Sequence, residues 1–304
     1  MTRVEGVVVA RAGGAYRVRT DAGVRDSTLR GRMKQEDADR VLVGDRVTLQ
    51  LHDDGAITIE DVLPRRSVLR RRNPGGRGRG VRHVAANIDQ LVVVGAARDP
   101  VWDPQLIDRF TAVAEANGLP VAVVINKSDL DPDAGSMGTP YRAAGYPVLV
   151  TSAKTGEGLD ALQRQLEGHV TVFTGPTGVG KSSLLNALVP GLTLRTGAVS
   201  RRARAGRHTT VSAEMHPFGE DGYVVDTPGL RDIGLWGLEP LEVGQAFPEF
   251  QRVRGHCRFD NCRHVAEPGC AVVEAAVAGE IAASRLESYR RLLAEAERAA
   301  RPWA

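Results

Sequence analysis

The segment GPTGVGKS at residues 175–182 constrains the fold of this chain more than any other. It matches the pattern G-x-x-x-x-G-K-[ST], in which a glycine-rich backbone wraps the phosphates of a nucleotide. The apolar stretch VTVF precedes the segment and SLLNALV follows it, so we expect a buried strand to enter the loop and a helix to leave it. A glycine-rich turn without a ligand is the alternative, and the flanking stretches favour the phosphate site. The candidate phosphate-binding residues are Gly175, Pro176, Thr177, Gly178, Val179, Gly180, Lys181, Ser182 and Ser183.

Asp226 is a candidate for the second acid that such a site needs. In a P-loop enzyme the lysine of the pattern (Lys181) reaches the β and γ phosphates, and the serine (Ser182) ligates Mg²⁺ together with a carboxylate from a later strand. Asp226 ends the apolar stretch YVV, 45 residues after Lys181, and begins the segment DTPG. Alone, DTPG is a common turn. Behind a P-loop at this distance it predicts a magnesium carboxylate, with the amide of Gly229 meeting the γ-phosphate.

Two further polar segments follow apolar runs and indicate a guanine site. Asn126, Lys127 and Asp129 follow PVAVVI. The carboxyl ends of strands are where open α/β sheets bind ligands. A carboxylate can accept from both N1–H and N2–H of guanine, a pair of donors that adenine lacks, while a lysine stem lies over the ring. The second segment follows PVLV and can supply an amide to guanine O6; its residues are Ser152, Ala153 and Lys154. A polar helix cap would also explain NKSD, but both segments beside a P-loop favour guanine.

The chain divides into four expected regions. Residues 1–63 alternate short apolar stretches with GG, DAG and DDG turns, which predicts a small barrel of about five strands. Residues 64–84 are rich in Pro, Gly and Arg, so we expect a linker that is mobile or ordered by a partner. Residues 85–235 alternate long apolar runs with helical patterns, which predicts an α/β domain with a mostly parallel sheet covered on both faces. Residues 236–304 read as helices with a cysteine cluster.

All three cysteines lie close together in the last region. With one histidine they form the pattern C-x4-C-x-H-x5-C, and the four residues are Cys257, Cys262, His264 and Cys270. Three thiolates and one imidazole close a tetrahedral zinc shell without an open position, so the predicted site is structural. His256 is a rival ligand, and buried free cysteines with a surface histidine are the alternative without metal.

The basic residues are almost all arginine, and they are clustered. Of the 40 Lys and Arg residues only four are Lys. Eight arginines lie between Arg65 and Arg82 and five between Arg195 and Arg207, with no acidic residue in either stretch. A solvated surface is the simpler explanation, but such runs also suit a polyanionic partner.

No apolar stretch approaches the roughly 18 residues of a membrane span, and no secretory signal is recognisable. We therefore expect a cytoplasmic protein with no membrane segment, as a monomer.

Taken together, these motifs resemble those of the TRAFAC-type GTPases, but in the order NKSD, SAK, GPTGVGKS, RHTT, DTPG. Ordinary members begin with the P-loop and end with the base motifs, so the sequence is similar to a circularly permuted GTPase. With a barrel similar to an OB-fold before the core and a Cys/His knuckle after it, nearly the whole chain resembles the RsgA (YjeQ) family. The resemblance implies a GTPase that binds the small ribosomal subunit and ribosomal RNA and acts in late maturation, with Zn²⁺ and Mg²⁺ as cofactors and GTP and GDP as substrate and product.

The residue that orients the attacking water in many GTPases is absent from its usual place in this sequence. Residue 230, just after DTPG, is Leu, where many GTPases carry the Gln that orients the attacking water. The segment AGRHTT supplies His208, to which the resemblance also points, beside two candidate magnesium hydroxyls, Thr209 and Thr210. Because leucine cannot orient water, an RNA-binding assembly chaperone with a structural nucleotide is the alternative function; NKSD argues against an ATPase or small-molecule kinase.

Overall fold

The computed structural model describes residues 2–12, 14–30, 41–72, 81–189, 191–194, 213–226 and 238–300. At its centre lies a mostly parallel sheet, as the alternation of apolar runs and helical patterns predicts. Five strands run parallel in the order β10-β9-β8-β11-β13, and β12 pairs antiparallel with β13 at one edge. Their bounds are β8 Gln90–Ala96, β9 Val121–Asn126, β10 Val148–Val150, β11 Val170–Thr174, β12 Glu214–Phe218 and β13 Gly222–Asp226.

Helices cover both faces of this sheet, because successive side chains of each strand point to opposite sides. In β8, Leu91 and Val93 join the core on one face, and Val92 and Val94 join the core on the other. The first face packs against α2 (Pro104–Ala116) and α3 (Thr139–Ala144), and the second against α4 (Leu159–Leu166) and α5 (Lys181–Leu188). The two-sided α/β core expected from the sequence is therefore present.

The N-terminal region forms the expected five-stranded barrel. The strand order is β1-β2-β3-β5-β4, and pairing of β1 with β4 closes the barrel. A single register pair, Ala10 with Glu214, joins β1 to β12 and so connects the barrel to the edge of the central sheet. The barrel strands are β1 Thr2–Ala12, β2 Ala15–Thr20, β3 Gly23–Leu29, β4 Arg46–Leu51 and β5 Ile57–Val62.

The Arg- and Gly-rich segment between barrel and core contains regular structure that the sequence did not suggest. Strands β6 (Val68–Arg72) and β7 (Val81–Ala86) pair antiparallel as a separate ribbon. The ribbon is anchored because Leu69 and Ala85 are fully buried in the core of the α/β domain. Its few apolar residues are hidden among arginines in the sequence, which is why composition alone indicated a linker over 64–84.

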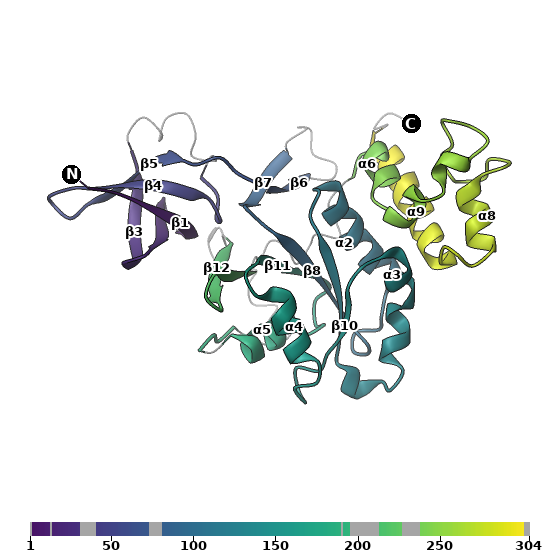
Figure 1. The fold of residues 1–304 in the computed structure, drawn as a ribbon, viewed down its shortest axis with the longest axis horizontal. Coiled ribbons are helices and arrows are strands. Elements are labelled where there is room, and N and C mark those ends of the chain that lie inside the picture. Colours follow the sequence, from purple (N-terminus) through teal and green to yellow (C-terminus); the bar gives the residue numbers. More distant parts are fainter. Residues whose placement is uncertain are drawn as a thin grey trace, which may run out of the picture.

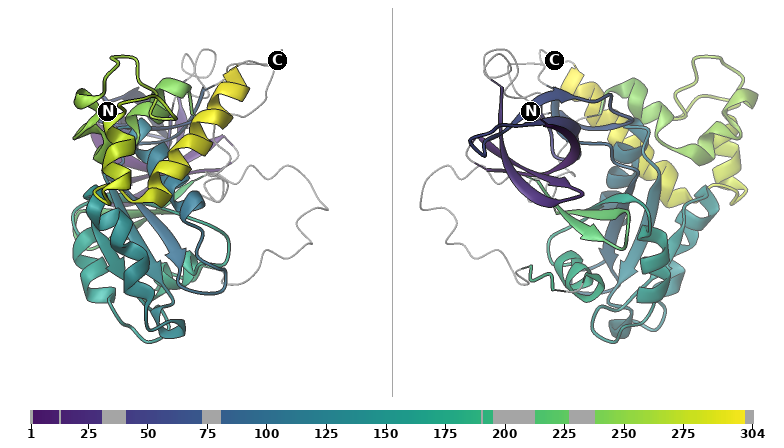
Figure 2. Two further views of the ribbon diagram at one scale, coloured as in Figure 1. Left: turned by 90° about the vertical axis from the view of Figure 1, so that its right-hand side faces the viewer. Right: turned by 60° about the vertical axis from the view of Figure 1, so that its left-hand side comes forward.

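The C-terminal region is helical, as expected. Its elements are α6 (Pro240–Gln245), α7 (Pro248–Gln251), a short 3-10 helix (Arg254–His256), α8 (Ala271–Val277) and α9 (Ala283–Ala300). Helix α9 packs on α2 of the α/β domain, and Figure 1 shows the barrel and these helices at opposite ends of the molecule. Figure 2 gives two further views, and in its left view the C-terminal helices lie in front of the barrel. Among the described residues, no helix combines the length and apolar character needed to cross a membrane.

Candidate nucleotide site and metal cluster

The predicted phosphate loop connects β11 to α5, at the carboxyl edge of the sheet. Gly175 (φ +134°) and Gly180 (φ +95°) adopt conformations that L side chains rarely take. A Cβ on Gly175 would lie 2.0 Å from the carbonyl oxygen of Val94, so no larger residue fits there. The Nζ of Lys181 donates to the carbonyl oxygens of Gly175 (2.6 Å) and Pro176 (2.7 Å), which places its ammonium within the loop. Ser182 and Ser183 follow in the first turn of α5, and Thr177 lies exposed at the loop's outer side.

Asn126 connects the phosphate loop to the two predicted base segments. Its side chain is 1% exposed, and its Nδ2 donates to the carbonyl oxygen of Val179 at 2.8 Å. Its Oδ1 accepts from the backbone N–H of Ala153 at 3.2 Å. One buried amide therefore fixes three loops that are 25 or more residues apart in the chain, as a preorganised site requires.

Asp129 lies against the second base segment. Ser152 Oγ donates to Asp129 Oδ1 at 2.7 Å, and the Nζ of Lys154 lies 3.6 Å from Asp129 Oδ2. The hydrogen bond from Ser152, with support from the charge of Lys154, lowers the pKa of Asp129 below its usual value. The carboxylate is therefore ionised at neutral pH and is ready to accept hydrogen bonds from a ligand.

Asp226 ends β13, the strand next to β11, so its backbone lies at the same carboxyl edge as the phosphate loop. The other expected residues around the γ-phosphate, Gly229, His208, Thr209 and Thr210, lie outside the described residues, as does Leu230.

The structure adds a neighbour of the phosphate loop that the sequence analysis missed. The loop after β8 reaches this edge: the Nζ of Lys127 donates to the carbonyl oxygen of Asp99. Pro100 Cδ is 3.6 Å from the position that a Cβ on Gly178 would occupy. The sequence could have indicated this neighbour. The long apolar run of β8 predicts a parallel strand, and the loop after it must lie at the same edge of the sheet as the loops after its parallel neighbours.

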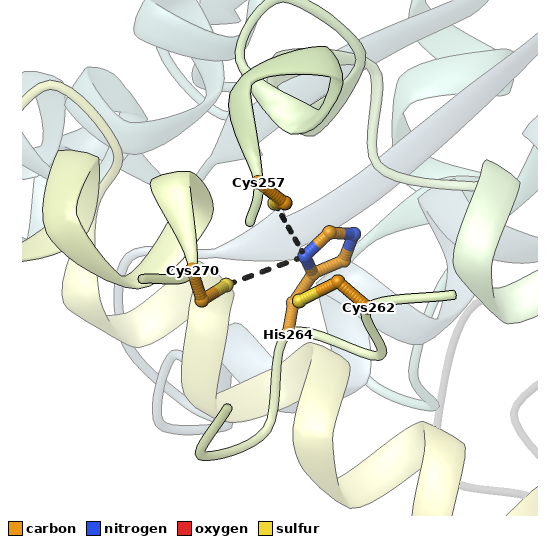
Figure 3. A group of neighbouring side chains, drawn as sticks. All are labelled: Cys257, Cys262, His264 and Cys270. Atoms are coloured by element: carbon orange, nitrogen blue, oxygen red, sulfur yellow. Dashed lines mark hydrogen bonds between the residues drawn. The ribbon is translucent and has the colours of Figure 1, made fainter. Parts of the chain in front are cut away.

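The four predicted metal ligands lie together in the C-terminal region, and Figure 3 shows their side chains around a common centre. The ligand atoms of Cys257, Cys262, His264 and Cys270 all lie within 4.8 Å of one another. His264 Nδ1 is 3.6 Å from Cys257 Sγ and 3.4 Å from Cys270 Sγ. Tetrahedral zinc, with bonds of about 2.3 Å to sulfur and 2.0 Å to nitrogen, separates such atoms by about 3.5 Å. The residues therefore fit zinc, and the rival ligand His256 is exposed and outside this group.

Burial sets the protonation of two residues of the cluster in the absence of a cation. Burial raises the pKa of Cys262 to about 12, so this thiol needs a nearby positive charge to become a thiolate. Burial lowers the pKa of His264, which keeps its imidazole neutral and able to bind a metal.

The comparison with protein families decides the identity of the chain. The sequence model of the RsgA GTPase family matches residues 62–236, which include both base segments, the phosphate loop and DTPG. The chain belongs to the RsgA GTPase family. As a member it is an enzyme that hydrolyses GTP, which confirms the function expected from the motifs.

RsgA relatives extend the likeness beyond the matched core. The small ribosomal subunit biogenesis GTPase RsgA of Gemmatimonas aurantiaca is 50% identical over 298 residues, covering 96% of this chain and 97% of the relative. The crystal structure of YjeQ from Thermotoga maritima is 36% identical with a TM-score of 0.80, covering 97% of this chain and 99% of that one. YloQ, described as a circularly permuted GTPase, is 29% identical with a TM-score of 0.72, covering 97% and 96%. These likenesses confirm the expected three-part fold and the RsgA resemblance.

Proposed function

We propose that this RsgA-family GTPase binds the small ribosomal subunit in the cytoplasm as a monomer, and that GTP hydrolysis ends its action in late maturation. The observation that carries the proposal is the guanine-type site in a chain similar over nearly its full length to small-subunit biogenesis GTPases. In this site Asp129 would accept from the guanine N1–H and N2–H groups, and the 152–154 backbone would donate to O6.

Hydrolysis would use groups at the carboxyl edge of the sheet. Lys181 would bind the β and γ phosphates, while Ser182 and Asp226 would ligate Mg²⁺, which supplies charge neutralisation at the phosphates. Thr209 or Thr210 would complete the magnesium shell, and the amide of Gly229 would meet the γ-phosphate. We assign His208 the positioning of the attacking water, because Leu230 carries no group that can orient it.

Arginine-rich surfaces support an RNA partner. On the β6–β7 ribbon the exposed Arg70 stands opposite the exposed His83, in a stretch of sequence (65–82) that contains eight arginines and no acidic residue. Such a basic stretch suits an anionic partner. In the cysteine-containing region, Arg254 and Arg258 are exposed and suited to phosphate contacts.

Two arginines of the C-terminal region instead make contacts within the protein. Arg252 Nη1 donates to the carbonyl oxygen of Ala143 at 3.2 Å, and Arg263 pairs with Glu297. These bonds attach the metal-binding region to α3 and to its own helix α9. The RNA-binding surface of this region is therefore expected to centre on Arg254 and Arg258.

The test is a turnover assay with GTP and with ATP, with and without purified small or large ribosomal subunits. The isolated protein should hydrolyse GTP at about 10⁻⁴ to 10⁻² per second, as unassisted GTPases do. Small subunits alone should stimulate this rate by about tenfold or more, with a strong dependence on salt because phosphate contacts carry the docking.

His208→Ala should lose most of the stimulation while GTP affinity stays near wild type, because Lys181 and Asp129 set the affinity. If His208→Ala is stimulated as strongly as wild type, another group positions the water. The alternative of an RNA-binding chaperone with a structural nucleotide would be supported if no ribosomal particle changes the rate and nucleotide-free protein binds the subunit equally well.

A further inference from the structure

Glu157 joins the two base-binding loops, here called the first base loop (126–129) and the second base loop (151–158). Its Oε2 accepts a hydrogen bond from Ser128 Oγ at 2.6 Å. We propose that Glu157 is a positioning residue for guanine recognition, which holds, through Ser128, the turn that presents Lys127 and Asp129 to the base. The inference rests on the base-binding role proposed for Asp129.

The turn at Lys127 needs to be held. Lys127 has φ 61° and ψ 39°, a left-handed conformation that is unfavourable for a residue with a side chain. Such a conformation persists only where its surroundings over-determine it. On one side Asn126 is buried. On the other side Ser128 is held at two points by the second base loop, through its N–H to the carbonyl oxygen of Thr151 (3.1 Å) and through its hydroxyl to Glu157.

The second base loop is shaped to place Glu157 beside the first. The carbonyl oxygen of Glu157 accepts from the N–H of Ser152 at 3.0 Å, and Ser152 Oγ in turn holds Asp129. Gly158 follows with φ +69°, and a Cβ there would lie 2.0 Å from the carbonyl oxygen of Val150. Glu157 therefore supports Asp129 by two routes, through its backbone to Ser152 and through its carboxylate to Ser128.

Loss of the carboxylate should loosen the base site and leave the phosphate site unchanged. Because the Ser128–Glu157 bond is exposed to solvent, we expect Glu157→Ala to weaken GTP binding and raise KM by about 3- to 10-fold. The basal kcat should change much less than KM, since Lys181 is held within the phosphate loop by the carbonyl oxygens of Gly175 and Pro176. Glu157→Gln keeps an acceptor oxygen for Ser128 and should restore most of the affinity.

Base discrimination separates this role from a general loss of structure. Inosine triphosphate lacks the 2-amino group of GTP, so the preference for GTP over inosine triphosphate reports how well Asp129 is placed. Glu157→Ala should reduce that preference, whereas a uniformly destabilised protein would bind both nucleotides less well and keep their ratio. Ser128→Ala should give the same phenotype as Glu157→Ala, and the double variant should be no worse than either. The matched control is Asp160→Ala. Asp160 is an exposed carboxylate in the first turn of α4, and among the described residues it makes no hydrogen bond to either base loop.

The experiment measures affinity for GTP and inosine triphosphate, together with KM and kcat, for these variants and for Asp129→Asn. The proposal is overturned if Glu157→Ala keeps wild-type affinity and preference while Asp129→Asn loses GTP. It is also overturned if removing the negative charge of Glu157 tightens binding of the anionic nucleotide. If Asp129→Asn itself binds GTP normally, the base-site assignment fails first, and the role of Glu157 in guanine recognition fails with it.

Discussion

Arg285 on α9 donates from Nη1 to Oδ1 of Asp108 on α2 at 2.8 Å, and both side chains are at most 1% exposed. The same guanidinium donates from Nε to Glu249 of α7 at 2.7 Å and lies over the ring of Phe247, 4.6 Å from its centroid. A buried charge without partners is very costly. This buried arginine therefore helps to attach the C-terminal helices to the GTPase core.

Replacing Arg285 by methionine should strongly destabilise the protein, because two buried carboxylates, Asp108 and Glu249, would lose their cation. Breaking a buried pair in this way costs about 3 to 5 kcal/mol in the free energy of unfolding. Denaturant unfolding measures this loss. Arg291→Met is the matched control on the same helix: its ion pair with Glu287 and its hydrogen bond to Gln105 of α2 are both exposed to solvent, and the change should cost less than about 1 kcal/mol. Equal losses in the two variants would contradict the role given to the buried Arg285.

The pH dependence of stability should carry a contribution from Glu115 on α2. Burial raises the pKa of this carboxyl, opposed in part by the charge of Arg285. A raised folded-state pKa means that ionisation destabilises the fold. The neutral form prevails at low pH, and stability is lost as pH rises from the ordinary glutamate value through the folded value.

Glu115→Gln, which stays neutral, should therefore raise the melting temperature at about pH 8 more than at about pH 5. Thermal unfolding at both pH values tests the sign. A variant that is less stable than wild type at the higher pH would show that favourable interactions of the charged carboxylate, among them the attraction to Arg285, outweigh the cost of burial.

Asp129→Asn should change the base preference of the enzyme. The asparagine amide can donate a hydrogen bond where the carboxylate could only accept one. This suits xanthosine triphosphate, because xanthine has an acceptor where guanine has its 2-amino donor. We expect GTP affinity to fall by about 30-fold or more and affinity for xanthosine triphosphate to rise. Competition binding with both nucleotides provides the measurement, and unchanged GTP affinity would remove Asp129 from the base site.

Cys262→Ser should release the metal and loosen the C-terminal region. Wild-type protein is expected to contain about one zinc per chain by metal analysis, since its four ligands close the shell. The variant should lose this metal and become sensitive to protease after residue 238, while nucleotide binding by the separate core is kept. His256→Ala is the control. Because His256 is exposed and lies outside the cluster, this variant should keep the zinc. Full protease resistance of metal-free protein would argue against a structural site.

Several features of this protein could be predicted from local sequence alone. The phosphate loop, each base segment and the set of metal ligands are contained in short stretches of at most 14 residues, so spacing and flanking periodicity identify them. Gly175 is an example. The carbonyl oxygen of Val94 approaches so closely that only glycine fits there, and the motif has glycine at that position. The continuous apolar run of β8 likewise predicts a strand covered on both faces.

The remaining features depend on contacts between distant residues. The β6–β7 ribbon exists because Leu69 and Ala85 reach the core of another segment, a gain in burial that the local Arg/Gly composition conceals. Arg285 looks like an ordinary helical surface residue until Asp108, 177 positions earlier, is placed beside it. The bond from Ser128 to Glu157 joins residues 29 apart. The sequence by itself determined the chemistry of each motif, because that chemistry resides in side chains that are close together in the chain. Only the tertiary structure decided which motifs hold one another in place, because pairing over long separations depends on how the whole chain packs.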